Sequence, residues 1–410
     1  MWSIITSGDR SGTGNGFAVG IWIVNQTDQT TIVWTANRDD PPVSSMATLE
    51  LTTEGLSLRD NKTMIESKVN GAEDSNITSA ALLDSGSFVL YSNDSIIWDS
   101  FDYPTDTILG GQNLSYSDNT QLVSSVSTTN HSSGKFSLLL KYDGNTNLAL
   151  YLVSTSDTYW IPTSPGRIYD RLSLNFEGSL FLTGSSTYED MVFANGSSSS
   201  SSSTSLAQGN RGKNGSVIYR ATVDDDGVFR LYSHHSYSVS HNNVFTSKVQ
   251  VEWSAFKDKC RVKGVCGLNS YCSVQEKKVD CYCYPGFAFI NPMLRSTGCY
   301  RKFTRDGCKT RKDDGEPASS MINSYNVTPI ENMLWDDSDS YSDLLMEKKA
   351  CSYSCLADCD CWAALHTEGH CRKCKLPLKY GRLDQSMPAT AFLKMVSLFI
   401  SGEFIVITSS

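Results

Sequence analysis

Short apolar runs alternate with polar turns along the first 130 residues of the chain. The runs are rich in β-branched and aromatic side chains, and they end at Gly, Asn, Asp or Ser. No apolar repeat of about 3.6 residues is sustained, so the pattern predicts short strands and no helix. Closely spaced strands favour a barrel, a sandwich or a prism of sheets. The clearest runs are 17–24, 31–34, 87–91 and 96–98.

Residues 131–255 repeat this turn-and-strand pattern, and we expect them to form a second β domain. Polar bends interrupt the apolar runs 134–153 and 218–234. Three aspartates in the second bend, 224–226, raise the alternative of a calcium site. Adjacent side chains that point in alternate directions do not supply the six to eight oxygens that calcium requires, so we expect a solvated turn. The unbroken serine run 197–203 predicts a flexible loop.

All 13 cysteines lie between Cys260 and Cys374. The first six occupy only 40 residues, which leave little room for an apolar core, so covalent bridges must hold that segment together. Zinc is the competing interpretation, but no two C-x2-C pairs stand at zinc-ribbon spacing there. We therefore expect disulfides, for which the spacing alone allows fifteen pairings of the six cysteines.

The later cysteines include a helical pattern. Cys351, Cys355 and Cys359 stand four residues apart, a spacing that places all three on one face of a helix, and residues 359–366 read as a short strand. Two chemical interpretations compete here. A redox C-x-x-C at 371–374 lacks the surrounding βαβ pattern. A metal site of His366, His370, Cys371 and Cys374 is disfavoured because Cys371 is the better disulfide partner.

The net charge and the N-glycosylation sequons indicate a secreted glycoprotein rather than a nucleic-acid-binding protein. A net charge of −9 and a pI near 5.2 argue against a nucleic-acid partner. Nine N-x-S/T sequons, together with the dense cysteines, favour a secreted and glycosylated surface. The sequon asparagines are Asn25, Asn61, Asn76, Asn93, Asn113, Asn130, Asn195, Asn214 and Asn326.

The two ends do not carry the signals of that compartment. Residues 1–16 lack the basic start and apolar run of a signal peptide. The apolar tail at 395–409 is shorter than the ~20 residues of a membrane span and contains Glu403. We interpret the chain as part of a longer receptor. No hydrolase elbow, P-loop, zinc-protease or kinase motif occurs, and we expect no catalytic residue, no cofactor and no metal.

Four segments carry a family resemblance: TIVWTANRDDPPV (31–43), LELTTEGLSLRDN (49–61), AALLDSGSFVLY (80–91) and WDSFDYPTDTIL (98–109). They resemble the bulb-type, or G-type, lectin domain of plant S-receptor-like serine/threonine kinases. The segment 260–292 resembles an EGF-like module, and the chain from Cys308 onward resembles a PAN/apple domain.

The resemblance implies a mainly β, multi-domain chain: bulb-lectin-type β-prism units, then a disulfide-rich EGF-like module and a small α+β PAN/apple domain. The expected domains are 1–130 (bulb-type lectin, with an incomplete N-terminus), 131–255 (second lectin-like domain), 256–303 (EGF-like), 304–394 (PAN/apple) and 395–410 (short apolar tail).

In bulb lectins, the pattern Q-x-D-x-N-x-V-x-Y binds mannose, because amide and carboxylate groups meet the sugar hydroxyls while Val and Tyr pack on the ring. The Gln, Asp and Asn positions here are Leu83, Ser85 and Ser87, and only Val89 and Tyr91 match. The site is therefore expected to be degenerate. Asp143, Asn145 and Tyr151 are the polar and aromatic candidates of the second domain.

The resemblance also implies disulfides. The expected EGF-like bridges are Cys260–Cys272, Cys266–Cys281 and Cys283–Cys299. In the PAN/apple domain Cys355–Cys361 is expected, with other pairs among Cys308, Cys351, Cys359 and Cys371. The thirteenth cysteine, Cys374, either bridges to another chain or remains a thiol.

The expected function is recognition: a non-catalytic region of a plant receptor-like kinase, outside the plasma membrane or secreted. Its expected partners are a glycan or protein ligand and related receptors that dimerise through the PAN domain. A secreted enzyme such as a glycosidase is the alternative, which a pocket with two carboxylates of shifted pKa would support.

Overall fold

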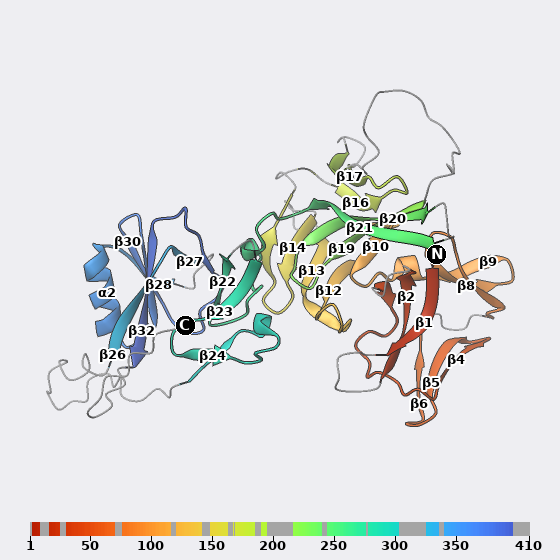
Figure 1. Cartoon of the computed structure of the whole chain (residues 1–410), viewed down its shortest axis with the longest axis horizontal. Coiled ribbons are helices and arrows are strands. Elements are labelled where there is room, and N and C mark those ends of the chain that lie inside the picture. The colour runs from red at the N-terminus through yellow and green to blue at the C-terminus, as the bar shows by residue number, and fades with distance from the viewer. Residues whose placement is uncertain are drawn as a thin grey trace. The chain divides into compact units, whose positions relative to one another are not determined.

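The computed structural model divides the chain into two compact units, residues 1–257 and 258–410 (Figure 1). It describes residues 2–8, 16–24, 30–69, 76–115, 120–141, 148–162, 167, 169–184, 190–194, 216–239, 244–275, 278–302, 325–335 and 340–396.

The first unit begins with three antiparallel sheets of three strands each, which we call the first prism. Their middle strands carry Ile21, Leu58 and Leu90, which all lie in one apolar core. The sheets are β1–β3 (Trp2–Gly8, Phe17–Ile23, Thr31–Thr35), β4–β6 (Ala47–Thr52, Gly55–Asp60, Ile65–Lys68) and β7–β9 (Ser79–Leu82, Phe88–Ser92, Ser95–Asp99). A 3-10 turn, η1 (Ser100–Asp102), follows the last strand.

Strand β1 is one of the three strands of the first sheet. Residues 2–8 pair with 17–23 of β2 over seven consecutive positions, although their composition had fitted the strand pattern poorly. The first sheet therefore has three strands, as its two neighbours have. The pairing is antiparallel and in continuous register. Backbone hydrogen bonds therefore define this strand, although its side-chain pattern did not predict it.

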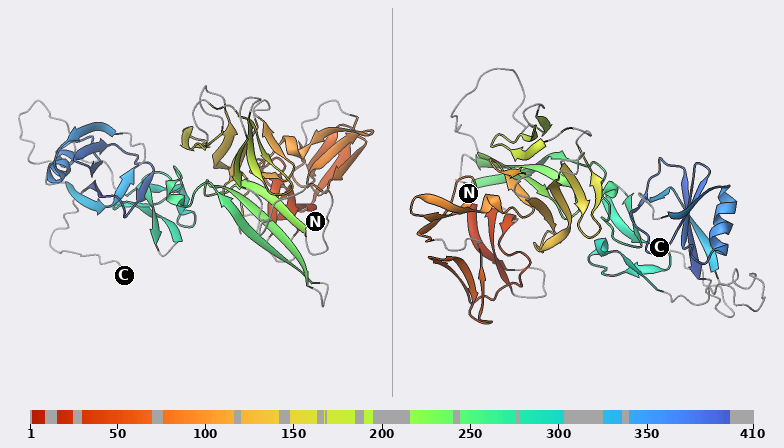
Figure 2. Two further views of the ribbon diagram at one scale, coloured as in Figure 1. Left: turned by 90° about the horizontal axis from the view of Figure 1, so that it is seen from above. Right: turned by 180° about the vertical axis from the view of Figure 1, so that it is seen from behind.

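Three antiparallel sheets of four strands form the second prism (Figure 2). Each begins with a strand from residues 107–125, a segment expected to belong to the first domain. The sheets are β10, β19–β21 (Thr107–Leu109, Ser216–Val223, Phe229–Val239, Val244–Ser254), β11, β16–β18 (Asn113–Ser115, Tyr169–Leu174, Leu180–Gly184, Met191–Ala194) and β12–β15 (Gln121–Ser125, Ser133–Leu140, Leu148–Leu152, Asp157–Trp160). By strand pairing, the second prism thus begins at Thr107.

The second unit joins the EGF-like module to the C-terminal α+β part through one sheet. Strand β22 (Ser270–Gln275) pairs with β31 (Gly381–Leu383) in parallel, and the order is β23–β22–β31–β27. The remaining strands are β23 (Lys278–Cys283), β24 (Phe287–Phe289), β25 (Cys299–Arg301), β26 (Tyr325–Glu331), β27 (Met333–Trp335), β28 (Ser340–Leu345), β29 (Ala363–Thr367), β30 (His370–Cys374) and β32 (Ala389–Val396). Two 3-10 turns, η2 (Lys259–Arg261) and η3 (Arg295–Thr297), complete the module.

Helix α2 (Lys348–Ala357) packs against the five-stranded sheet β26–β32–β29–β30–β28. Cys351 and Cys355 lie on its buried face, as the spacing predicts. Cys359 does not lie on the helix, which is a correction, because Asp358 adopts an extended conformation and ends it. Strand β29 begins at Ala363, within the segment expected to form a strand.

Candidate functional site

Strand β8 carries the expected mannose positions. A turn closed by a hydrogen bond from the Gly86 N–H to the Leu83 carbonyl (2.9 Å) leads into it, and Gly86 has a φ of 89°, which favours glycine. Val89 is fully buried and Ser87 is 2% exposed, whereas Leu83, Ser85 and Tyr91 are partly exposed. The five positions therefore do not form a continuous exposed polar surface.

The polar atoms of this strand are used inside the protein. The Ser87 hydroxyl donates to Asp99, and the Ser87 backbone N–H donates to the Ser85 hydroxyl (3.3 Å). Asp99 also accepts from the Phe101 N–H (2.8 Å) and so caps η1. Small hydroxyl side chains that are tied to the turn offer a sugar fewer groups than the amide and carboxylate of the lectin pattern.

The candidates of the second domain are partly placed. Asp143 and Asn145 lie outside the described residues. On β14, the Tyr151 hydroxyl donates to Gln121 Oε1 (2.8 Å), which also accepts from the Ser137 hydroxyl (3.0 Å). Tyr151 is therefore tied to Gln121 of β12, two strands away in the same sheet.

The aspartate bend between β19 and β20 is not a solvated turn, which corrects the expectation. Arg230 donates to both oxygens of Asp226 (2.8 and 2.9 Å) and pairs with Asp224. The Tyr232 hydroxyl donates to Asp224 (2.6 Å). Burial raises the pKa of Asp224, while Tyr232 and Arg230 oppose that shift. The bend is thus an internal ion-pair network, and the described residues hold no cluster suited to a metal ion.

A cleft of about 640 Å³ opens in the first prism. It lies where the third strand of each sheet ends, at Trp34 and Thr35 of β3, Ser67 and Lys68 of β6, and Trp98 of β9. The turn after β3 and the chain after η1 complete its lining with Asn37, Arg38, Asp39, Asp40, Val69, Tyr103 and Thr105. One hollow is therefore shared by all three sheets.

Aromatic rings form one wall of the cleft. Trp98 stacks on Tyr103, with ring centroids 5.6 Å apart and planes 10° from parallel, and it meets Trp34 edge-on at 6.1 Å. The Trp34 indole N–H donates to the Tyr103 carbonyl (2.8 Å). Tyr103 is 54% exposed, whereas both indoles are buried. A fixed aromatic ring thus presents itself to solvent at the cleft.

Two charged groups of the lining are engaged in the fold. The Arg38 guanidinium donates to the carbonyls of Val123 (2.8 Å), Ser124 (3.0 Å), His131 (2.8 Å) and Ser132 (3.2 Å). Asp39 accepts from the Ser133 backbone and hydroxyl (2.7 and 2.6 Å). Arg38 and Asp39 therefore fasten the first prism to strands β12 and β13 of the second, and neither was recognised from the sequence.

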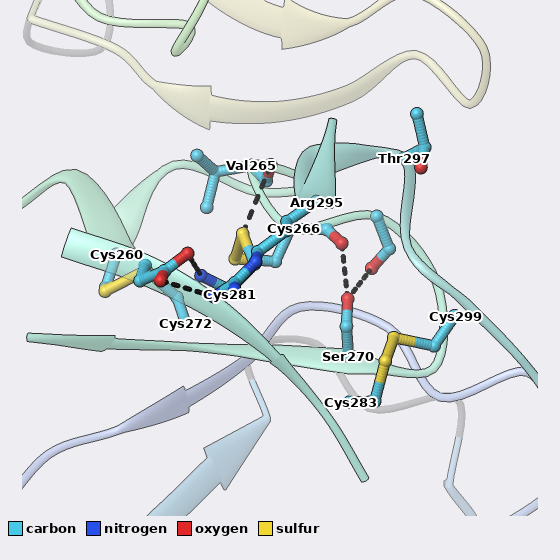
Figure 3. The surroundings of a disulfide bond; sticks show 12 residues. Cys260, Val265, Cys266, Ser270, Cys272, Cys281, Cys283, Arg295, Thr297 and Cys299 are labelled. Atoms are coloured by element: carbon cyan, nitrogen blue, oxygen red, sulfur yellow. Dashed lines mark hydrogen bonds and ion pairs between the residues drawn. A yellow bond between two sulfur atoms is a disulfide. The ribbon is translucent and has the colours of Figure 1, made fainter. Parts of the chain in front are cut away.

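Figure 3 shows the disulfides of the EGF-like module, which has the bridges Cys260–Cys272, Cys266–Cys281 and Cys283–Cys299 that the resemblance implies. Four of these cysteines form its buried cluster in place of an apolar core. The Ser270 hydroxyl donates to the Cys266 and Gly267 carbonyls, and Arg295 pairs with Asp280 (2.6 Å). The crosslinks are thus reinforced by short polar contacts.

The C-terminal part contains Cys355–Cys361, as expected, and also Cys351–Cys371. Cys359 is disulfide-bonded too, whereas Cys308 lies outside the described residues. Cys374 remains a buried thiol. Since Cys371 is in a disulfide, it is not a metal ligand. His366 lies 3.1 Å from the Met346 carbonyl and His370 lies 3.0 Å from Asp343.

Six of the nine sequon asparagines fall in the described part of the chain, and all six are exposed. They are Asn61, Asn76, Asn93, Asn113, Asn130 and Asn326. Asn25, Asn195 and Asn214, like the serine run 197–203 and most of the tail after 395, lie outside the described residues. Within the described part, no helix combines the length and the apolar character needed to cross a membrane.

Comparison with known proteins gives two family matches. Residues 31–130 match the family described as D-mannose binding lectin, and residues 173–291 match the S-locus glycoprotein domain. The G-type lectin S-receptor-like serine/threonine-protein kinase LECRK2 of Oryza sativa subsp. japonica is 30% identical over an aligned length of 412 positions, which covers 94% of this chain and 47% of the relative. The chain is related to the G-type lectin S-receptor-like kinases.

Two further relatives support this. LECRK3 of Oryza sativa subsp. indica is 28% identical over 96% of this chain and 48% of its own length, and the receptor-like serine/threonine-protein kinase SD1-7 of Arabidopsis thaliana is 29% identical over 81% and 36%. The chain spans about half the length of these relatives or less, and it matches the lectin and S-locus glycoprotein regions.

Proposed function

We propose that this chain is the ligand-recognising, non-catalytic region of a plant receptor-like kinase that lies outside the plasma membrane or is secreted. Its carbohydrate-binding-type fold presents a degenerate mannose site at β8. The kinase relatives support the receptor assignment, and the disulfides and exposed sequons support an oxidising, glycosylating compartment.

One observation supports the proposal that the β8 positions do not bind mannose. The Asn position of the lectin pattern is Ser87, whose hydroxyl is buried and donates to Asp99. A sugar hydroxyl would have to replace this internal hydrogen bond, and the neighbouring positions, Leu83 and Ser85, supply neither an amide nor a carboxylate. Recognition therefore uses another surface of the fold or another class of ligand.

The enzyme alternative receives no comparable support. Burial raises the pKa of the Asp224 carboxyl, as a general acid would need. However, this carboxyl is paired with Arg230 and accepts a hydrogen bond from Tyr232. The two exposed carboxylates of the cleft, Asp39 and Asp40, are adjacent in sequence, and Asp39 accepts two hydrogen bonds from Ser133. Glycosidases instead place two carboxyl groups on either side of the scissile bond.

Mannose binding tests the proposal. The native protein and the variant Leu83→Gln/Ser85→Asp/Ser87→Asn are compared on a mannose-bearing glycan array and by titration calorimetry. We expect no mannose binding by the native protein and measurable binding by the variant. Because Ser87 is buried, Leu83→Gln/Ser85→Asp is run beside it as a variant that leaves the Ser87–Asp99 contact intact.

Circular dichroism first establishes that each variant is folded. Mannose binding by the native protein that disappears in Tyr91→Ala would overturn the proposal, because it would mean that the β8 site works without its three polar groups.

An exposed edge strand favours a second role, contact between receptors through the C-terminal α+β part, which we propose is a PAN/apple domain. Strand β28 lies at the edge of the five-stranded sheet and exposes Leu344 (52%) and Leu345 (77%). Unpaired edges with apolar side chains tend to pair with another chain. Light scattering of the native protein and Leu344→Lys/Leu345→Lys tests this, and a concentration-independent monomer in both would contradict it.

A further inference from the structure

The two prisms close their ends differently. In the first prism, Trp34 pairs with Ile21 and Trp98 pairs with Leu90, so an indole lies beside the buried middle strand in two sheets. At the corresponding place in the third sheet, Ser67 pairs with Leu58. One of three aromatic positions is therefore occupied by a hydroxymethyl group, and Ser67 lines the cleft.

The second prism has an aromatic side chain from each sheet in this place. Trp160 pairs with Leu150 and Trp253 pairs with Leu231. In the remaining sheet Phe193 lies at a β-bulge, with its ring 6.0 Å from Trp160 and 5.5 Å from Trp253. Three rings in mutual contact fill the position that Ser67 leaves open in the first prism.

We propose that the cleft beside Ser67 binds a neutral sugar residue at the end of a glycan, with the Tyr103 ring as its platform. This inference rests on the proposed function and specifies where recognition occurs. The volume of about 640 Å³ suits a small ligand. Trp98 backs one side of the Tyr103 ring, which remains 54% exposed and so offers an apolar surface to the C–H groups of a sugar.

The polar groups of the cleft match a neutral ligand. Arg38 and Asp39 are engaged in the fold, which leaves Asp40 and Lys68, one of each sign, exposed at the cleft. Their side chains make no hydrogen bond or ion pair with the part of the chain that the structure describes. A carboxylate that accepts and an ammonium that donates suit adjacent sugar hydroxyls.

The buried wall contains a further donor. The Trp98 indole N–H has no hydrogen-bond acceptor among the described residues, although the side chain is only 6% exposed. A buried donor without an acceptor is uncommon and calls for an explanation such as a water or a ligand. This N–H is enclosed in the aromatic wall, so a ligand in the cleft would reach it only after a shift of the neighbouring rings.

The test is saturation-transfer NMR of the full chain with glucose, galactose, xylose and N-acetylglucosamine, followed by titration of whichever binds. We expect binding of at least one sugar, weakened about tenfold or more by Tyr103→Ala, as for a central aromatic contact. Ser67→Trp should abolish it by filling the cleft. Asp40→Asn should weaken it less, because the amide retains an acceptor.

Tyr353→Ala is the matched control, since Tyr353 is a similarly exposed tyrosine (63%) on helix α2 of the other unit. It should leave binding unchanged. A sugar that binds equally well to Tyr103→Ala and Ser67→Trp would overturn this inference while leaving the proposed recognition function in place. Binding of no sugar by the folded native protein would also overturn it, and would leave a protein ligand as the form of the proposed function.

Discussion

The two prisms have the same plan, three antiparallel sheets around an apolar core, and in the first a cleft lies at the ends of the third strands. In the second prism, Trp160, Phe193 and Trp253 contact one another in this place. In the first, Trp34 and Trp98 face Ser67 across the same region. The comparison teaches that the absence of one large side chain can leave a hollow at the end of a β-prism.

The largest effect is expected from opening the second prism. Trp253→Ser would remove the indole that contacts Trp160, Phe193 and Phe229, and we expect a loss of about 3 kcal/mol in stability, the range of large-to-small aromatic substitutions. Hydrogen–deuterium exchange would locate the loss in β20 and β21. Unchanged protection there would show that the three rings do not stabilise the prism.

A somewhat smaller effect is expected where the prisms meet. Arg38→Ala would leave four backbone carbonyls, two on β12 and two in the turn before β13, without their charged donor, which we expect to cost about 2–3 kcal/mol. Arg38→Lys should rescue little, because an ammonium cannot reproduce the guanidinium fork. Thermal unfolding measures this, with Arg59→Ala as control, since Arg59 is exposed on β5. Equal melting temperatures for Arg38→Ala and Arg59→Ala would contradict it.

Low pH should lower the stability of the protein through a buried histidine of the second prism. Burial, with smaller contributions from Arg220 and His235, lowers the pKa of His234 on β20 to about 3. Its Nε2 accepts from Arg220 (3.0 Å), and its Nδ1 has no partner among the described residues. Because the unfolded chain takes up this proton near pH 6.5 and the folded one does not, stability should fall as the pH drops below about 6.5, by on the order of 2–3 kcal/mol at pH 4.

His234→Gln tests this origin. The glutamine amide keeps an acceptor for Arg220 but does not titrate. Thermal unfolding from pH 7 to pH 4 should therefore show a shallower loss of stability in the variant. An identical pH dependence in both proteins would assign the acid sensitivity to other groups.

Local sequence pattern predicted the local structure. The runs at 17–24 and 87–91 are strands, and the bend before β8 has its glycine at a positive φ. The cysteine spacing, read through its family resemblance, gave the pairings of the EGF-like module. These features depend on residues a short distance apart in the chain.

Long-range pairing was not predictable in this way. Arg38 contacts carbonyls more than 80 residues away, and β10 pairs with a strand more than 100 residues away. Alternation of apolar and polar residues states which face a side chain occupies but not which strand will lie beside it. The cleft was missed for the same reason, since Ser67 is significant only when compared with Trp34 and Trp98 across three sheets.

The sheet that joins β22 to β31 bears on how parts of this chain can be exchanged with those of a relative. Tyr284 of the EGF-like module is 1% exposed, its hydroxyl accepts from the Trp335 indole (2.8 Å), and it shares a core with Met333 and Leu378. The EGF-like module therefore belongs to the same folding unit as the C-terminal α+β part. A chimaera spliced near residue 303 would exchange half of a folding unit, whereas one spliced at Lys257 would exchange a whole one.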